Sequence, residues 1–494
     1  MAGTVPNIGD LRVEYQTEEQ VLSRARRLPG MTFRDVLELG IAPEGVSREY
    51  NSRRYKGGMG NLIEERFFGY RANDDRAPDF AEAGVELKVT CVDARRDGSL
   101  VAGERIVLTM IPFDEELPEE LSDSHLWEKC ARMLIVWYRR DRSVDPYDQE
   151  ILYARMFTPP EEDLRVIEED YRAIARLVRE GRADELSESQ TNYLGACTKG
   201  ATRAKSMREQ SYYAPGKVAH RRAFSLKRPY VDYVLNHYVM GEPEPEPVAV
   251  DPREARRRTV FGAVTATINA HAGETDRELC ASLGIGYSGN KAQWTTIVYR
   301  LLGVRGERAA EFEKAGVRVR TLRAEHGLSG LRESVPVLNI DFASLAGEDL
   351  WEDSALYALL SETRFLFVVF EKGEDAGDPC RLLGCVLWGM PADDLDGPAR
   401  RCWELARDCV RRGPALVPRA RGGFSNDLPK ISDGLCVHVR PRAQQSAYRL
   451  SDGPEVGNVE RDAEPLPDGR WMTRQTFWLS AGYVLDEVRK LLVD

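Results

Sequence analysis

The sequence predicts a mixed α/β protein made of two domains of similar build. Three observations support this fold class: strand-like and helix-like patterns alternate, residues 241–252 have the composition of a linker, and a pattern from the first half returns in the second. A length of 494 residues is also too great for one ordinary hydrophobic core. We therefore expect domains at residues 1–240 and 253–494.

The first half contains both kinds of element. Residues 85–91 alternate apolar side chains with Glu86, Lys88 and Thr90, which is the period-2 pattern of a strand. After Pro159 and Pro160, three acidic residues open an amphipathic helix. The elements expected in chain order are helices at residues 18–45 and 61–68, strands at 85–91, 106–111 and 133–138, and the helix that starts near residue 161 and ends before Gly181.

A candidate site lies around the strand at residues 85–91. Glu86 and Lys88 project from the same face of this strand, because side chains two residues apart share a face. Asp79 precedes the strand by a short segment that contains Gly84, so we expect Asp79 beside Glu86 across a hairpin. Glu64, on the helix at residues 61–68, reaches the same edge.

Three clustered carboxylates repel one another unless a cation neutralises them, and hard oxygen ligands suit Mg²⁺ rather than zinc. A magnesium ion would polarise a scissile phosphate and lower the pKa of a water molecule. Lys88 would then hold that water and offset the developing charge. Lys129 is a second candidate, one helical turn after His125. The set predicts a magnesium-dependent DNA phosphodiesterase.

A Glu-x-Lys pair on a strand is common by chance in a chain that is 30% charged, so the pair alone says little. The specific signal is the whole string, namely residues 56–64 (Lys-Gly-Gly-Met-Gly-Asn-Leu-Ile-Glu), 78–80 (Pro-Asp-Phe) and 84–88 (Gly-Val-Glu-Leu-Lys). This string resembles the MutH and Sau-three-AI family of GATC endonucleases. Ala81 departs from the family, which usually has proline after Asp-Phe.

The resemblance implies a restriction-endonuclease-like (PD-(D/E)xK) fold with a magnesium site. By this resemblance the metal ligands are Asp79, Glu86 and Glu64, and the catalytic residues are Glu64, Asp79, Glu86, Lys88 and Lys129.

The formal net charge of −11 argues against a nucleic-acid partner only superficially, because the distribution of charge matters more than the total. Residues 199–228 are strongly basic and interleaved with aromatic residues. The DNA-binding candidates in this segment are Lys199, Arg203, Lys205, Arg221, Arg222 and Lys227. An ordinary basic surface remains the alternative.

The resemblance adds a groove-reading role for Lys199. Tyr193-Leu194 followed by Lys199-Gly200-Ala201 is similar to the family segment that carries base-contacting residues. Two positions depart from MutH: Cys197 replaces an arginine, and Ser225 replaces a tyrosine near the adenine. A response to adenine methylation therefore does not follow.

The second half repeats the pattern without its chemistry. Residues 241–252 alternate Pro and Glu and predict an extended, semi-rigid spacer. Residues 310–320 then align with residues 78–88, although chance similarity over so short a stretch remains an alternative. In this alignment Glu311, Arg318 and Arg320 replace Asp79, Glu86 and Lys88, and Val298 replaces Glu64. The second copy is therefore expected to be catalytically inactive.

An inactive copy that remains folded is expected to bind DNA without cutting it. Arg440-Pro441-Arg442-Ala443 resembles the Arg-Pro-Lys-Ala of MutH, and both arginines are suited to bidentate contacts with guanine or phosphate. Arginines on a solvated strand edge are the alternative.

The resemblance extends over essentially the full length and implies a type II restriction endonuclease of the IIE arrangement. Such an enzyme cuts double-stranded DNA before the G of GATC, binds two DNA sites per chain and forms a DNA-induced homodimer. A MutH-like repair nickase and a modification-reading DNA-binding protein are the alternatives. We see no apolar run of membrane-spanning length and no Cys-x-x-Cys pair among nine cysteines, so we expect a cytoplasmic protein with no membrane partner.

Overall fold

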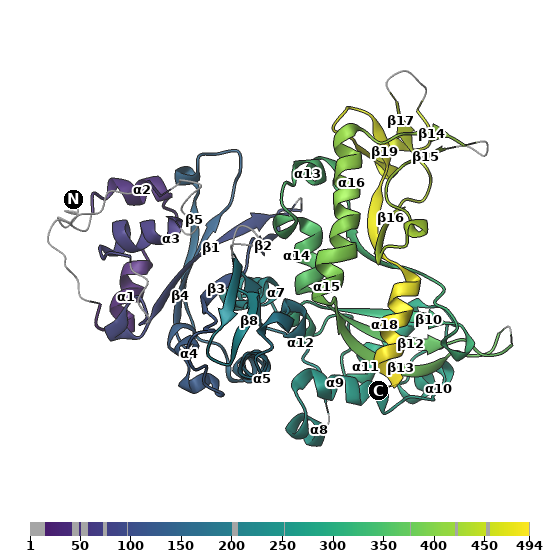
Figure 1. Cartoon of the computed structure of the whole chain (residues 1–494), viewed down its shortest axis with the longest axis horizontal. Coiled ribbons are helices and arrows are strands. Elements are labelled where there is room, and N and C mark those ends of the chain that lie inside the picture. Colours follow the sequence, from purple (N-terminus) through teal and green to yellow (C-terminus); the bar gives the residue numbers. More distant parts are fainter. Residues whose placement is uncertain are drawn as a thin grey trace. The chain divides into compact units, whose positions relative to one another are not determined.

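The chain forms two compact units, unit 1 at Met1–Glu244 and unit 2 at Pro245–Asp494 (Figure 1). The computed structural model describes residues 15–41, 49–50, 58–72, 77–95, 97–199, 206–250, 252–375, 377–419, 423–450 and 455–493. The division between the units falls inside the segment predicted as a linker, residues 241–252. Within the described ranges, no helix has the length and apolar character needed to cross a membrane.

The main sheet of unit 1 has four strands. Their order is β2 (Leu100–Ala102), β1 (Glu86–Ala94), β4 (Met133–Arg139) and β5 (Ile151–Phe157). β1 and β4 run parallel with Glu86 opposite Met133, while β2 and β5 are antiparallel to their neighbours. β4 lies between two strands and buries every side chain from Met133 to Trp137. The predicted strands at residues 85–91 and 133–138 are confirmed.

A second sheet of unit 1 has the order β3 (Ile106–Met110), β9 (Arg222–Leu226) and β6 (Leu194–Thr198), all antiparallel. The predicted long helix is confirmed as α5 (Glu161–Arg179), which follows Pro160 and buries one face. Unit 1 also contains the β-hairpin β7 (Met207–Gln210) and β8 (Ala214–His220), the helix α4 (His125–Cys130), and α7 (Arg228–Tyr233) with its continuation η7 (Val234–Val239).

The region predicted to be helical, residues 18–45, contains two short helices, and residues 42–45 lie outside the described residues. α1 (Glu18–Ala25) ends before Gly30, which has a left-handed φ of +86°. α2 (Phe33–Glu38) starts anew because the Thr32 side chain accepts a hydrogen bond from the Asp35 backbone N–H at 3.1 Å. The predicted helix at residues 61–68 is present as α3 (Gly58–Leu62), followed by the π-helical turn η1 (Ile63–Phe68).

Unit 2 has two main sheets that resemble those of unit 1, except that the first has three strands and no counterpart of β2. One has the order β10 (Val317–Ala324), β12 (Arg364–Glu371) and β13 (Arg381–Gly389), with β10 and β12 parallel and β13 antiparallel. The other has the order β11 (Val335–Asn339), β20 (Gln475–Leu479) and β16 (Val437–Pro441), all antiparallel. In each unit an antiparallel strand, β5 or β13, pairs with the second strand of the parallel pair. The last strand of each unit, β9 or β20, lies in the middle of the other sheet.

Helices and short strands complete unit 2. The helices are α8 (Pro252–Arg257), α9 (Val260–Asn269), α10 (Asp276–Ser282), α11 (Ala292–Leu301), α12 (Ala310–Ala315), α13 (Phe342–Gly347), α14 (Ala355–Glu362), α15 (Ala392–Asp394), α16 (Arg400–Arg412), α17 (Val459–Asp462) and α18 (Ala481–Val493). The short strands are β14 (Val417–Pro418), β15 (Phe424–Ser425), β17 (Tyr448–Arg449), β18 (Ala463–Pro465) and β19 (Trp471–Thr473).

The segment predicted as a spacer is extended, but unit 2 holds part of it in place. The Val248 N–H donates to Glu311 Oε2 at 2.9 Å, and the Ala249 N–H donates to the Leu302 carbonyl at 2.8 Å. The Glu246 carbonyl accepts from the Ala310 N–H at 3.1 Å. The proline-rich composition predicted the extended backbone but not these contacts, because they depend on a surface more than 50 residues away in sequence.

Candidate active site

Asp79 and Glu86 lie side by side across a tight hairpin, as their spacing predicts. Phe80 pairs with Val85, and Gly84 turns the chain with a left-handed φ of +62°. Asp79 Oδ2 accepts a hydrogen bond from the Leu87 N–H at 2.8 Å, and the Asp79 N–H donates to Glu86 Oε2 at 3.3 Å. The hairpin therefore fixes both carboxylates at the start of β1.

Two lysine side chains hold the Glu86 carboxylate. Lys88 Nζ donates to Glu86 Oε1 at 2.6 Å, and Lys129 Nζ donates to Glu86 Oε2 at 3.1 Å. Lys129 also donates to the Ala77 carbonyl at 3.1 Å. It lies in the last turn of α4, which leads into β4, and because β4 runs parallel to β1 the two strands start at the same edge of the sheet.

Glu64 belongs to the same charged cluster. Burial, followed by the charges of Asp79 and Glu86, raises the pKa of Glu64 to about 8, while the Lys88 ammonium lowers it. Burial and the Glu86 charge raise the pKa of Asp79 to about 6 against the opposing effect of Lys88. The two lysines thus compensate the carboxylates only in part.

A neighbouring carboxylate, Glu65, fixes the backbone that carries Glu64, and sequence reasoning missed it. Glu65 is fully buried, accepts a hydrogen bond from the Tyr50 hydroxyl at 2.7 Å, and accepts another from the Ala72 N–H at 3.3 Å. Gly58 approaches Tyr50 so closely that a Cβ atom would lie 1.9 Å from the Tyr50 carbonyl oxygen. The only signal in the sequence was the adjacent Glu-Glu pair, which does not show which carboxylate is structural.

Tyr70 is a second residue that sequence reasoning missed. Burial, and then the charges of Asp79, Glu64 and Glu86, raise the pKa of Tyr70 well above its ordinary value. Its hydroxyl is buried and has no hydrogen-bond partner among the described residues. Its ring packs edge-on against Phe80, with 5.3 Å between the centroids. Tyr70 therefore stays neutral beside the carboxylates as a hydrogen-bond donor.

The donor set fits a hard divalent cation. In the part of the chain that the structure describes, no three His, Cys, Asp or Glu side chains converge in ligating geometry. Glu86 faces two ammonium groups instead. Glu64, Asp79 and Glu86 nevertheless supply negatively charged oxygen ligands. The raised pKa values of Glu64 and Asp79 reflect burial and mutual repulsion, which a cation would relieve.

Replacing Glu64 with glutamine is expected to raise the melting temperature of the metal-free protein by a few degrees at pH 8.5. The pKa of Glu64 is raised from 4.5 to about 8, so ionising it disfavours the folded state. The stability associated with the protonated carboxyl is complete below pH 4.5 and is lost as the pH rises through about 8. Calorimetry in EDTA at pH 4.5 and 8.5 measures this difference.

The matched control is Glu82→Gln, an exposed carboxylate in the same hairpin. This control should leave the melting temperature unchanged at both pH values. A Glu64→Gln protein that is less stable than the unsubstituted protein at pH 8.5 would contradict the assignment of charge repulsion at Glu64.

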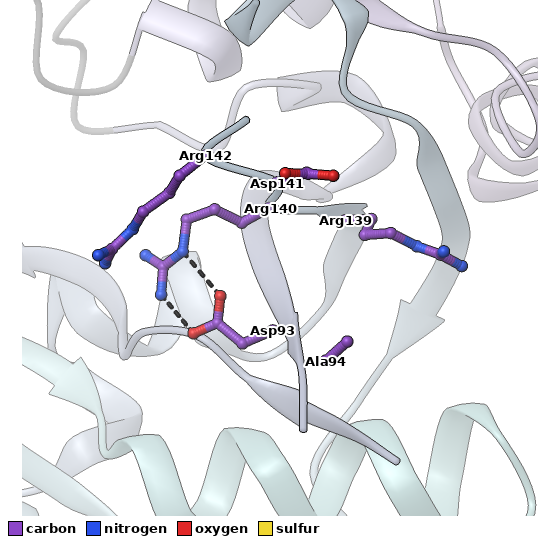
Figure 2. Close-up of a pocket in the computed structure, with 6 residues that line it drawn as sticks. All are labelled: Asp93, Ala94, Arg139, Arg140, Asp141 and Arg142. Atoms are coloured by element: carbon purple, nitrogen blue, oxygen red, sulfur yellow. Dashed lines mark hydrogen bonds and ion pairs between the residues drawn. The ribbon is translucent and has the colours of Figure 1, made fainter. Parts of the chain in front are cut away.

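A pocket of about 470 Å³ lies at the opposite ends of the same strands (Figure 2). It is lined by Asp93, Ala94, Arg139, Arg140, Asp141 and Arg142. Arg140 forms two hydrogen bonds with the Asp93 carboxylate, one of them 2.8 Å from Nε to Oδ1. Asp93 lies seven positions after Glu86 along the extended strand, or about 23 Å away. The pocket therefore lies apart from the carboxylate cluster.

The predicted DNA-binding residues of unit 1 fall into three groups. Lys199 follows β6, and its N–H donates to the carbonyl of the exposed Arg221 at 2.8 Å, so these two candidates lie together. Arg203 and Lys205 lie outside the described residues.

The remaining two candidates, Arg222 and Lys227, are buried. Lys227 is 1% exposed, and its ammonium donates to the carbonyls of Glu188 and Thr191 at 2.9 and 3.0 Å. Arg222 is 7% exposed and donates to the Ala196 carbonyl at 2.8 Å. Neither side chain is exposed to a DNA partner in this structure, and their contact with DNA stays a prediction. Arg222 begins β9, the middle strand of its sheet, and Lys227 directly follows that strand, so both cations lie against backbone carbonyl groups.

Arg440 and Arg442 lie at the end of β16 in unit 2. β16 pairs with β20 as β6 pairs with β9, with Val437 opposite Leu479 where unit 1 has Leu194 opposite Leu226. In this register Arg440 matches Cys197, Arg442 matches Lys199 and Trp478 matches Ser225.

Both arginines are exposed. The Arg440 guanidinium lies 5.2 Å from the ring centroid of Trp478, and Arg442 donates to Asn339 Oδ1 at 3.2 Å. Trp478 was missed from the sequence, because its position became clear only from the strand register.

Comparison with known proteins gives matches along the whole chain. The profile of the family described as DNA mismatch repair enzyme MutH matches residues 68–170, which include Asp79, Glu86, Lys88 and Lys129. The type II restriction enzyme Sau3AI of Staphylococcus aureus is 30% identical over 97% of this chain and 99% of its own length. The DNA mismatch repair protein MutH of Vibrio campbellii is 24% identical over 47% of this chain and 100% of its own length. MutH of Shigella boydii serotype 18 is 27% identical over 46% of this chain and 94% of its own length.

Proposed function

The chain belongs to the family of the type II restriction enzyme Sau3AI, and from this membership we propose that unit 1 cuts DNA while unit 2 binds a second copy of the site as an effector. The protein is a site-specific deoxyribonuclease, and its MutH-like region has a restriction-endonuclease-like fold. The observation that carries the proposal is the cluster of Glu64, Asp79 and Glu86 with two lysines at one edge of the sheet.

We assign Asp79, Glu86 and Glu64 to hold Mg²⁺. When bound, the ion supplies polarisation of the scissile phosphate and a water molecule of lowered pKa. Lys88 and Lys129 orient the Glu86 carboxylate, and their side chains are 18% and 13% exposed. Lys88 offsets the negative charge that develops on the phosphate, and Lys129 anchors α4 against the hairpin through Ala77.

We propose that unit 2 is an eroded copy of unit 1. The shared strand order and the matching register of β6–β9 and β16–β20 support this, as do Phe224 and Leu226, which recur as Phe477 and Leu479. Gly84 and Gly316 both turn the chain in the left-handed conformation directly before the matching strands. The catalytic positions have changed, because Arg318 and Arg320 stand for Glu86 and Lys88, and the fully buried Val298 stands for Glu64.

The target is proposed to be GATC, cut before the G to leave 5′ phosphates. In unit 1 the readers are Lys199 and Arg221, which lie together at one end of the second sheet, and in unit 2 they are Arg440 and Arg442. Each active site acts on one strand, so a double-strand break needs two chains, and we propose a homodimer that forms on DNA. A cytoplasmic location, where such DNA would be met, completes the proposal.

A repair endonuclease that nicks one strand is the second candidate. The MutH proteins cover only 46–47% of this chain, and the MutH profile matches residues of unit 1. A DNA-binding protein that reads modification without cutting is disfavoured by the full set of carboxylates and lysines in unit 1.

These candidates differ on short duplexes that carry one GATC site. With Mg²⁺ and no partner protein, the restriction function predicts cleavage of both strands of an unmodified duplex. A MutH-like nickase would cut one strand of a hemimethylated duplex and would leave the unmodified duplex intact. Denaturing gel electrophoresis of duplexes labelled on either strand distinguishes the outcomes, and a duplex without GATC is the control.

A further inference from the structure

Unit 2 carries a guanidinium cluster where unit 1 carries its carboxylates. Arg318 and Arg320 project from one face of β10, at the positions that Glu86 and Lys88 occupy on β1. The charges of both Arg318 and Arg442 act on Arg320, so the cluster extends to the exposed end of β16. The position that attracts a cation in unit 1 therefore repels one in unit 2.

The positive charge of Arg320 is partly buried and lies near other positive charges. Burial lowers its pKa, the like charges of Arg318 and Arg442 lower it further, and the opposing effect of Tyr299 is smaller. One terminal nitrogen donates to the Val319 carbonyl at 2.9 Å, but Nε has no acceptor among the described residues. Because a partly buried charge without a counter-ion costs stability, its presence indicates an anion that binds there.

A cavity of about 340 Å³ borders this arginine. Its lining includes Arg320, Arg323, Ser334 and Trp478, together with Lys291, whose ammonium donates to the lining carboxylate of Glu333 at 2.6 Å. Three of its N–H groups are buried and lack an acceptor in the described part of the chain: Nε of Arg320, Nε of Arg323 and Nε1 of Trp478. Trp478 also packs beneath Arg440, so the cavity adjoins the proposed DNA-reading strand. A cavity with several unsatisfied donors fits a ligand that has only acceptor oxygens.

We propose that this cavity binds one backbone phosphate of the second DNA duplex, with Arg320 as its principal ligand. This inference rests on the proposed effector role of unit 2. A guanidinium matches a phosphate through two parallel N–H···O bonds, and the indole N–H and Arg323 supply further donors. A free phosphate ion has the same chemistry, but the continuity of the cluster with the exposed Arg442 and Arg440 favours a phosphate that is part of DNA.

The test uses the full chain and a plasmid with one site, to which a short duplex bearing the site is added in increasing amounts. The duplex concentration that gives half-maximal stimulation of cleavage reports its affinity for unit 2. Arg320→Gln is expected to raise this concentration about tenfold, as expected for the loss of a charged hydrogen bond. The affinity of the duplex should also depend less steeply on salt concentration, by the amount expected for the loss of about one phosphate contact.

The matched control is Arg401→Gln, an exposed arginine on α16 that pairs with Glu404 at 3.7 Å. It should leave both the half-maximal concentration and the salt dependence unchanged. Without DNA, Arg320→Gln should melt at the same temperature as the unsubstituted chain or higher, because repulsion from Arg318 and Arg442 is relieved. A purely structural arginine would instead lower the melting temperature and leave stimulation intact.

Neutral methylphosphonate groups, placed one at a time in the added duplex, identify the phosphate. At one position the methylphosphonate should weaken stimulation of the unsubstituted chain. The same modified duplex should stimulate Arg320→Gln as well as the unmodified duplex does, because the contact is already lost. If inorganic phosphate stabilises the unsubstituted chain and not Arg320→Gln, while both respond to the duplex equally, the cavity binds free phosphate and the DNA assignment is wrong. If the unsubstituted chain shows no stimulation at all, the effector role fails and the phosphate site fails with it. If the duplex stimulates the unsubstituted chain and stimulates Arg320→Gln to the same extent, the effector role stands and the phosphate site is wrong.

Discussion

Asp79→Ala is expected to reduce DNA cleavage by on the order of 10³-fold or more, or about 4 kcal/mol of transition-state stabilisation. Asp79 lies against Glu86 and supplies one of three oxygen ligands for the proposed magnesium ion. Its removal takes away a metal ligand without touching Lys199, Arg221 or any residue of unit 2. Cleavage of a GATC plasmid and binding of a GATC duplex, measured on the same preparation, check the prediction.

Binding should be unchanged or slightly tighter in the Asp79→Ala protein, because one negative charge that repels phosphate is gone. Glu82→Gln, in the same hairpin but exposed, should cut at the normal rate. An Asp79→Ala protein that cuts within tenfold of the normal rate would remove Asp79 from the active site. A parallel loss of binding would show instead that the hairpin had been disrupted.

Arg440→Ala is expected to weaken stimulation by a second site, with the half-maximal concentration of added duplex rising about tenfold or more. Arg440 is exposed at the end of β16 and stacks on Trp478, which fixes its planar fork for a base edge or phosphate. Cleavage of a one-site plasmid without added duplex should not change. Initial rates on one-site and two-site plasmids at limiting enzyme concentration measure the effect.

Arg449→Ala provides a matched control for Arg440→Ala. Arg449 also lies over an indole ring, 5.1 Å from the centroid of Trp471, but on β17 of a different sheet. Its substitution should leave two-site stimulation intact. If Arg440→Ala retains full stimulation, unit 2 does not use β16 to bind the effector duplex.

Local patterns predicted the part of the site that depends on short-range geometry. The alternation around Glu86 gave the strand, and Gly84 gave the hairpin that brings Asp79 to it. Lys129 could be predicted as a site residue because α4 leads directly into a strand parallel to β1. For these residues the chain itself supplies the distance constraint.

What the sequence did not reveal depends on contacts between distant segments. Lys227 and Arg222 belong to a basic run that is typical of a DNA-binding surface, yet the position of β9 in the middle of its sheet buries them against backbone carbonyls. Glu65 and Tyr70 could not be distinguished from ordinary surface or core residues without knowing that Glu65 accepts a hydrogen bond from Tyr50 and that Tyr70 lies near the carboxylates. The match of Trp478 to Ser225 required the pairing of β16 with β20.

Digestion of an unmodified plasmid with several GATC sites by the purified chain tests the central claim most directly, which is that the carboxylate cluster of unit 1 hydrolyses DNA with magnesium. The expected result is a set of double-strand breaks with 5′ phosphates before the G of each GATC, in the presence of Mg²⁺ and abolished by EDTA. Absence of cleavage in unmodified DNA under these conditions would contradict the account.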